Sequence, residues 1–314
     1  MGNTEEGNQT AIREFILLGF GNLLELQPFL FSFFLMIYIL TLTGNCFIIL
    51  LVVADQHLHT PMYFFLANLS CLETCTSSVI LPKMLADMIS QKRTISLNGC
   101  LTQFYFFGSF VAVETYILAV MSYDRYVAIC RPLLYASIMN GKLCCQLMAG
   151  TWTNGPFFNG ILVGLLAQLY FCGPNVINHY FCDLTPIEKL SCSDTSRIEL
   201  FTLFSAFFIT VTPFLLILIS YICIMSTILK IPSAVGRKKQ KAFATCSSHL
   251  IVVTLFFLSL FLVYVVPETE KLKELHKIFS FFYTIFTPML NPLIYSLRNR
   301  EVKEALFKFV RIFL

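Results

Sequence analysis

Asp124, Arg125 and Tyr126 are three consecutive polar residues that follow a long apolar run from Leu101 to Val120. A membrane-buried helix carries an adjacent acid and base only at its end or for a function, because charge is costly within hydrocarbon. Pro132 then closes the helix, since proline cannot continue the backbone hydrogen-bond ladder. These residues therefore predict a charge pair that neutralises itself locally at the end of a buried helix.

Glu73 and Glu114 are isolated carboxyl residues in the middle of apolar runs. A carboxylate at that depth is costly, so both residues are candidates for a function. Two chemistries stay open: one or both carboxyl groups are protonated and hydrogen-bonded, or the two help to hold a cation. Such acids also motivate a membrane transporter or channel as an alternative function. However, the sequence has no internal repeat of the kind that is common in transporters.

The composition places these residues in a membrane. Of the 314 residues, 57% are hydrophobic and 13% are charged, and the mean hydropathy is +0.74. A soluble domain averages about one quarter charged residues. The apolar runs are continuous over about 20 residues, the length of a membrane-spanning helix, and do not alternate as barrel strands do. The chain is therefore predicted to be an integral membrane protein built from helices. Its net charge of +4 does not imply binding to nucleic acid.

Seven apolar spans are expected to cross the membrane, which predicts an all-α fold, a seven-transmembrane helix bundle. Thr60 and Pro61 start the second span, as a capping residue followed by proline at the first helical position. The chain then divides into an N-terminal segment 1–27, the bundle 28–297 and a C-terminal segment 298–314. The spans cover approximately residues 28–54, 60–87, 98–130, 143–167, 197–229, 239–266 and 274–297.

The C-terminal segment is predicted to be a short amphipathic helix on the inner leaflet. Its charged residues, among them Lys303 and Lys308, lie mostly opposite an apolar face. A solvated charged tail is the alternative. The apolar face consists of Val302, Ala305, Leu306, Phe309, Val310 and Phe313.

The distribution of basic residues predicts the orientation in the plasma membrane. Lys and Arg gather in the loops after spans one, three and five and in the C-terminal segment. By the positive-inside rule, the N-terminus is then extracellular and the C-terminus cytoplasmic. Asn8 begins a glycosylation sequon in the outer segment. Four of the twelve cysteines fall on the oxidising outer side, where three pairings are possible: Cys100, Cys172, Cys182 and Cys192.

Six motifs, in order along the chain, carry a resemblance to a known family. They are Gly44-Asn45, LHTPMYFFLANLS at 58–70, MSYDRYVAIC at 121–130, Ser220-Tyr221, KAFATCSSHL at 241–250 and PMLNPLIYSLRN at 288–299. With these motifs the chain resembles an odorant (olfactory) receptor of the rhodopsin-like, or class A, G-protein-coupled receptors over essentially its whole length. The long second outer loop with three cysteines resembles the tetrapod-type branch.

The resemblance implies two disulfides, Cys100 with Cys182 and Cys172 with Cys192. It also implies that Asp124, Arg125 and Tyr126 form a two-state switch. In the closed bundle the neighbouring carboxylate holds Arg125, and in the open bundle Arg125 reaches the C-terminal helix of a G protein. Further switch residues are Tyr221, Asn291, Pro292 and Tyr295. A basic surface for the G protein, or for anionic lipid, is formed by Lys238, Lys239 and Lys241.

The resemblance places Glu73 and Glu114 in an internal polar cluster together with Asn45 and Asn291. It further implies that the outer half of the bundle holds the ligand in an apolar cavity with few polar groups. Most of the family has Asp at the position of Glu73 and Tyr at the position of Phe257. The expected ligand-binding residues are Phe104, Phe107, Gly108, Val111, Ala112, Ser205, Ile209, Leu260, Tyr264, Phe281 and Thr284.

The predicted function is that of an odorant receptor. It binds a small, mostly apolar volatile molecule and activates a stimulatory G protein, which raises cyclic AMP. No acid lies between Phe104 and Ala112, which argues against an amine ligand. No enzyme activity or cofactor is expected, because catalytic and nucleotide motifs are absent. His179 beside Cys182 lacks the further ligands of a metal site. The expected partners are the odorant, the heterotrimeric G protein and the lipid bilayer.

Overall fold

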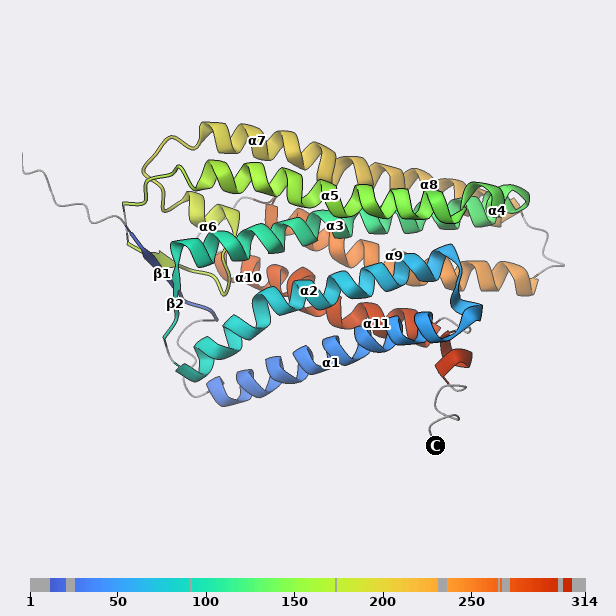
Figure 1. Ribbon diagram of the computed structural model, residues 1–314, viewed down its shortest axis with the longest axis horizontal. Helices are drawn as coiled ribbons and strands as arrows, with labels where there is room; N and C mark the ends of the chain where they lie inside the picture. Colours follow the sequence, from blue (N-terminus) through green and yellow to red (C-terminus); the bar gives the residue numbers. More distant parts are fainter. Residues whose placement is uncertain are drawn as a thin grey trace, which may run out of the picture.

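The computed structural model is a bundle of long helices that run roughly along its longest axis (Figure 1). It describes residues 12–20, 26–90, 92–172, 174–230, 236–264, 266, 272–298 and 302–306. Asn8 and its sequon lie outside these residues, as do Phe309, Val310 and Phe313 of the predicted amphipathic helix. Within that helix, residues 302–306 are helical, and Val302 and Ala305 are buried as the apolar face requires.

Each predicted span coincides with one helix or with a run of consecutive helical segments, so the helix-bundle fold class is confirmed. Among the described residues, the helical stretches 27–54, 61–90, 97–130 and 196–230 are each long and apolar enough to cross a membrane. The single helices are α1 (Gln27–Ala54), α2 (Pro61–Ser90), α3 (Leu97–Cys130), α5 (Gly141–Leu166) and α9 (Gly236–Tyr264). The fifth span comprises α7 (Ser196–Ala206), η4 (Phe207–Val211) and α8 (Thr212–Lys230), and the seventh comprises α10 (Lys273–Phe281), η6 (Phe282–Phe286) and α11 (Thr287–Arg298).

The helix ends follow from local sequence signals. The second span begins at Pro61 as predicted. Ser96 caps α3 and Asn140 caps α5, each accepting a hydrogen bond from the amide three residues later, at 3.1 and 3.0 Å. At its other end α3 stops before Pro132, which opens the short turn η3 (Pro132–Leu134) ahead of α4 (Tyr135–Ile138). These signals fix the end of α3 at Cys130, so Asp124, Arg125 and Tyr126 lie within its last two turns.

Two spans contain a π-helical turn that the sequence did not predict. The turn η4 lies within the fifth span and η6 within the seventh. Such turns are rare and are found most often at functional sites. Ile209 lies in η4 and Thr284 in η6, and Phe281 directly precedes η6. Both π-helical turns therefore contain predicted ligand residues.

α3 is the central element of the bundle, because it packs against α2, α5 and α8. Gly155 of α5 lies so close to α3 that a Cβ atom there would stand 2.4 Å from the carbonyl oxygen of Ser109. The indole nitrogen of Trp152, the only tryptophan, donates a hydrogen bond to Oδ1 of Asn68 at 3.2 Å and so joins α5 to α2. Gly155 thus lets α5 pack closely against α3, and the bond between Trp152 and Asn68 holds α5 beside α2.

A small three-stranded sheet lies at the end of the bundle opposite α4 (Figure 1). Its central strand β1 (Glu14–Leu17) runs antiparallel to β2 (Thr94–Ser96) and parallel to β3 (Val176–Ile177). Phe15 of β1 is fully buried, and its ring lies 5.4 Å from the ring of Phe171. The all-α prediction did not include these strands, because each is too short to show an alternating pattern. The sheet ties the N-terminal segment to the two loops that contain β2 and β3.

We predict that Gly155→Ala destabilises the protein, because the added methyl group would collide with the backbone of α3. Overpacking of this kind costs about 1–3 kcal/mol, so the midpoint of thermal denaturation in detergent should fall by several degrees. Gly164 is the matched control in the same helix, since a Cβ atom there meets nothing within 4 Å. Gly164→Ala should be neutral or stabilising by roughly 0.5–1 kcal/mol. Equal midpoints for the two variants would contradict the close approach of α5 to α3.

Candidate functional site

The predicted ligand residues come from several elements around the half of α3 that is nearer the sheet. Phe107 is buried, and its ring lies 4.8 Å from Phe181 of the second outer loop and 6.0 Å from Tyr283 of η6. Phe104 instead belongs to the cluster around Cys100. Gly108 faces α5, since a Cβ atom there would meet Oδ1 of Asn159 at 2.4 Å. Val111, Ile209 and Phe281 are partly buried, and Ala112, Ser205, Leu260 and Thr284 are buried.

The second outer loop folds inward and covers this aromatic cluster. The disulfide between Cys100 and Cys182, with Cα atoms 5.4 Å apart, fixes the loop to the start of α3. The second disulfide joins Cys172 to Cys192, with Cα atoms 5.9 Å apart, so both implied pairings are confirmed. Phe181 next to the first disulfide is fully buried. We refer to residues 179–183 as the lid.

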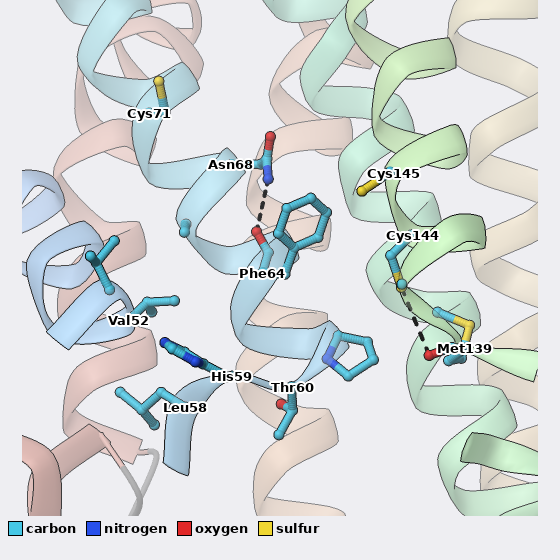
Figure 2. Close-up of a pocket in the computed structure, with 14 residues that line it drawn as sticks. Val52, Leu58, His59, Thr60, Phe64, Asn68, Cys71, Met139, Cys144 and Cys145 are labelled. Atoms are coloured by element: carbon cyan, nitrogen blue, oxygen red, sulfur yellow. Dashed lines mark hydrogen bonds between the residues drawn. The ribbon is translucent and has the colours of Figure 1, made fainter. Parts of the chain in front are cut away.

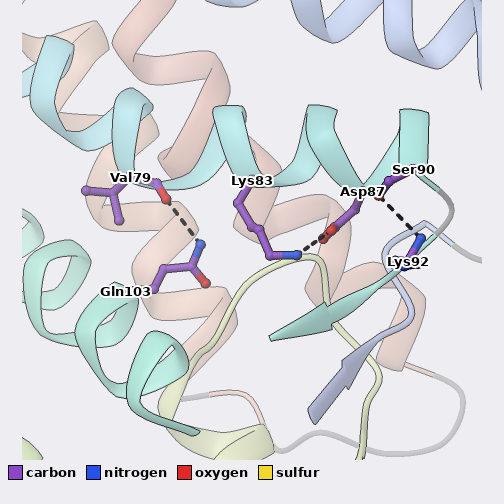
Figure 3. A network of polar contacts seen from close by, with 6 residues as sticks. All are labelled: Val79, Lys83, Asp87, Ser90, Lys92 and Gln103. Atoms are coloured by element: carbon purple, nitrogen blue, oxygen red, sulfur yellow. Dashed lines mark hydrogen bonds and ion pairs between the residues drawn. The ribbon is translucent and has the colours of Figure 1, made fainter. Parts of the chain in front are cut away.

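Gln103 connects the lid to α2 by two hydrogen bonds. Its Nε2 donates to the carbonyl oxygen of Val79 in α2 at 3.1 Å, and its Oε1 accepts from the amide of Cys182 at 3.0 Å. Figure 3 shows Gln103 beside α2, where Lys83 and Asp87 form an ion pair one turn apart. Sequence reasoning missed Gln103 and Phe181 as site residues. The neighbouring Cys182 was the only available signal for Phe181.

Tyrosine hydroxyl groups connect the lid to the outer ends of the sixth and seventh spans. Tyr264 in α9 donates a hydrogen bond to Oδ1 of Asp183 at 3.0 Å, and its oxygen lies 3.1 Å from the hydroxyl of Tyr283. In addition, the hydroxyl groups of Tyr180 and Thr284 are 2.8 Å apart. Movement of α9 or of η6 therefore changes contacts of the lid.

Asp183 is a buried carboxyl residue in the lid, only 4% exposed. Burial raises the pKa of its carboxyl group to about 6, although hydrogen bonds from the amide of Leu184 and from Tyr264 oppose the shift. Nearby, burial and the neighbouring acids Glu199 and Asp183 raise the pKa of Glu188 to about 7. Asp183 in the lid and Glu188 five residues after it thus take up protons more readily than ordinary carboxyl groups.

The predicted polar cluster forms at the middle of the bundle. Asn291 donates to Oε1 of Glu73, and the carboxyl groups of Glu73 and Glu114 are within hydrogen-bonding reach of each other. Asn45 donates to the carbonyl oxygens of Thr41 at 3.0 Å and Pro288 at 3.1 Å. One side-chain oxygen on each of Asn45, Glu73, Glu114 and Asn291 is buried without a hydrogen-bond partner. Within the described residues no set of three His, Cys, Asp or Glu side chains could hold a metal ion.

Asp124 and Arg125 pair at the opposite end of α3 from the lid. Their carboxylate and guanidinium groups are 3.6 Å apart, and Tyr135 of α4 donates a second bond to Asp124 at 2.8 Å. Nε of Arg125 also contacts the sulfur atom of Met62 in α2 at 3.2 Å. The predicted charge pair therefore forms, and it also contacts α2 and α4. Sequence reasoning missed Tyr135, which lies eleven residues further on.

The remaining predicted switch residues have contacts of their own in several helices. The hydroxyl of Tyr221 in α8 lies 2.6 Å from Nδ1 of His249 in α9. Pro292 lies against Gly44, where an added Cβ would stand 3.1 Å from the proline ring. Tyr126 is partly buried, and its ring is 6.3 Å from that of Tyr123. The side chains of Lys238, Lys239, Lys241 and Tyr295 lie outside the described part of the structure.

Comparisons with known proteins find similarity over nearly the whole chain. A family model described as "Olfactory receptor" matches residues 34–312. Olfactory receptor 10A5 of Homo sapiens is 51% identical over 301 residues, covering 96% of this chain and 94% of that protein. Olfactory receptor 5M5 of Mus musculus is 49% identical over 310 residues, covering 97% and 95%. Squid rhodopsin shares the fold, with a TM-score of 0.71 at 17% identity, over 88% of this chain and 78% of that chain.

We predict that Asp183 makes the protein less stable as pH rises from about 5 to about 7. Its pKa in the folded protein, about 6, lies above the ordinary value of 3.8. The folded state therefore binds the proton more tightly, and this stabilisation is lost as pH rises through the folded pKa. The loss should be roughly 1 kcal/mol between these pH values. The thermal midpoint of wild type should fall more over this range than that of Asp183→Asn, and parallel curves would contradict the assignment.

Proposed function

The chain belongs to the olfactory receptor family, and on this premise we propose that it binds a small, uncharged volatile molecule under the lid and raises cyclic AMP through a stimulatory G protein. Membership of the family makes it a multi-pass plasma-membrane receptor of the G-protein-coupled class and not an enzyme. It gives no support to the transporter or channel alternative.

The proposed orientation puts the lid and the sheet outside the cell and the charge pair of Asp124 and Arg125 in the cytoplasm. The Lys and Arg residues of the sequence favour it, because they are most frequent in the loops at the end of the charge pair. The two disulfides also favour it, since both lie at the lid end, where an oxidising compartment would let them form.

The ligand site in this proposal is the aromatic cluster between the lid, α3, η4, α9 and η6. Phe107, Phe181 and Tyr283 supply apolar surface for a volatile molecule. Asp183 is the nearest carboxyl group in the lid, and it is already engaged by Tyr264 and by the amide of Leu184. An uncharged ligand therefore suits the site better than a cation.

The polar groups of the site favour a ligand that donates a hydrogen bond. Ser205 donates its own proton to the carbonyl oxygen of Thr202 at 3.0 Å, and Tyr264 donates its proton to Asp183. Thr284 likewise donates to the carbonyl oxygen of Ser280 at 2.7 Å. These three hydroxyl groups keep only lone pairs for a ligand, because a hydroxyl has one proton to donate. The proposed ligand class is therefore alcohols and phenols with an apolar skeleton.

α9 is the proposed path from the ligand to the G protein, and its geometry is the observation that carries the proposal. The helix is 29 residues long and contains no proline, so it moves as one rigid element. Tyr264 near its outer end contacts the lid, and His249 contacts Tyr221 about 22 Å nearer the cytoplasm. A ligand that displaces Tyr264 would tilt the helix, separate His249 from Tyr221 and open the bundle beside Arg125.

We predict that Arg125→Ala lowers the ligand-stimulated cyclic AMP response by about tenfold or more, because the open bundle loses its contact with the G protein. Cells expressing the receptor would be tested with cyclic AMP and surface expression read in parallel. Arg131→Ala is the control, since Arg131 is an exposed cation six residues further on. Undiminished signalling by Arg125→Ala at equal surface expression would refute the switch.

We also predict that alcohols activate the receptor more potently than the aldehyde or methyl ether of the same carbon skeleton. The difference should be roughly 2- to 10-fold, which is the net value of one hydrogen bond. Ser205→Ala and Tyr264→Phe should each reduce this preference, whereas Thr43→Val, in α1 away from the site, should leave it unchanged. The site would be misassigned if the best agonists were amines whose potency follows their ionisation.

A further inference from the structure

An apolar groove of about 720 Å³ lies between α2 and α5 at the end of the bundle that holds Asp124 and Arg125 (Figure 2). Its volume is within the range of about 300–1,000 Å³ that is typical of sites for small ligands. None of the 14 residues that line it is Asp, Glu, Lys or Arg. Asn68, one of the polar residues in its wall, is already bonded to Trp152 and to the carbonyl oxygen of Phe64. The groove is therefore suited to hydrocarbon.

Three cysteines line this groove, and they differ in access and in depth. Cys145 is exposed, and Figure 2 shows its thiol turned toward the groove. Cys144 is buried, and its thiol is directed at the carbonyl oxygen of Met139. Cys71 is exposed but lies ten residues into α2, about 15 Å from the helix start. Cys145 is the one of the three that combines exposure with a shallow position.

Cys145 lies close to the start of α5, which is the cytoplasmic end of that helix in the proposed orientation. It follows the first residue of α5, Gly141, by four positions, which is about 6 Å along the helix. Lys142 beside it is exposed and can hold its charge among the lipid headgroups. Cysteines next to the membrane boundary are acceptors for reversible S-palmitoylation.

We propose that Cys145 is an S-acylation site and that its saturated acyl chain lies in the groove between α2 and α5. The thiolate of Cys145 attacks the carbonyl carbon of an acyl-coenzyme A thioester held by a membrane acyltransferase. A new thioester bond forms at Sγ, the bond to coenzyme A breaks, and coenzyme A leaves as the thiol with the proton that Cys145 released. No redox step is involved.

The dimensions of the groove fit a chain that starts at Cys145. The groove extends along α2 from Pro61 to Cys71, about 15 Å, which is half of the hydrocarbon core of about 30 Å. An acyl chain attached at the boundary would thus reach the middle of the bilayer while it fills the gap between the two helices. The segment 300–314 contains no cysteine, so in the chain as given the acyl anchor would sit on the bundle itself.

The acylation proposal rests on the proposed orientation, in which α5 begins in the cytoplasm. The test uses the full-length receptor in cells fed an alkynyl palmitate analogue, with the label read on the purified protein before and after hydroxylamine. We expect wild type to carry a hydroxylamine-sensitive label that Cys145→Ser loses. Cys144→Ser and Cys71→Ser, the matched controls from the same groove, should keep it. Label that persists in Cys145→Ser, or wild type without label, would overturn the proposal.

Two further measurements separate a failure of the acylation proposal from a failure of the proposed orientation. Mass spectrometry of the wild-type peptide that contains Cys145 should find the palmitoyl mass shift, so the assignment does not depend on the folding of a variant. A palmitoyl group elsewhere, or a copurified free lipid with an unmodified Cys145, would refute the assignment. A membrane-impermeant maleimide applied to intact cells separately tests the orientation: labelling of Cys145 would mean that the orientation itself is wrong. Loss of the cyclic AMP response with the acyl label intact would count against the proposed function alone.

Asn68→Leu tests the place of the chain in the groove. This variant removes the bond to Trp152, which joins α2 to α5, and leaves Cys145 untouched. If the acyl chain lies between these helices, a looser groove should speed the release of label during a chase with unlabelled palmitate. A release rate equal to that of wild type would place the chain in bulk lipid and not in the groove.

Discussion

Hydrocarbon offers no hydrogen-bond partner, and the rest of this structure depends on that constraint. Every backbone amide in a span must be satisfied within the chain, which selects helices for the seven apolar stretches. The same constraint acts on side chains. Threonine hydroxyl groups in the spans bond back to carbonyl groups of their own helix, as Thr41 does to Ile37 at 2.8 Å. Other polar groups connect helices, and some of them, such as Asn45 and Asn68, also bond back to their own helix.

Those connecting groups lie at three levels along α3. Gln103 and the disulfide of Cys100 join the outer end to the lid. Glu114 approaches Glu73 at the middle, and Asp124 is held by Arg125 and Tyr135 at the inner end. α3 packs against α2, α5 and α8 along its length, so a shift at one level is passed to its neighbours by contact.

The surface between α2 and α5 is also shaped by the lack of hydrogen-bond partners in hydrocarbon. Gly155 lets α5 approach α3 closely, whereas α5 and α2 meet mainly through Trp152 and Asn68. The gap that remains between α5 and α2 is lined mainly by apolar groups and thiols, with Asn68 among its few polar residues. Bilayer lipid or an attached acyl chain fills such a gap without loss, because neither needs a hydrogen bond. The interior of the bundle thus satisfies its polar groups with hydrogen bonds between helices, whereas the groove needs few hydrogen bonds because few polar groups line it.

The amino-acid sequence alone determined the class of the fold and the family. Three kinds of signal could be recognised without coordinates, because each depends on neighbouring residues only. They are the seven long apolar runs, the polar end of α3, and the motifs around Asn45 and Asn291. The π-helical turns η4 and η6 could not be predicted, because both lie in stretches with few polar residues, where the phase shift caused by one inserted residue does not show.

Only the tertiary structure decided which distant residues meet. It brought Phe181 onto Phe107, Tyr264 onto Asp183 and Tyr135 onto Asp124. It also paired β1 with strands that lie about 80 and 160 residues further along the chain. No local pattern encodes such pairs, because they arise when whole helices pack. A side chain's partner in a bundle is set by the crossing of helices, and that depends on all their contacts together.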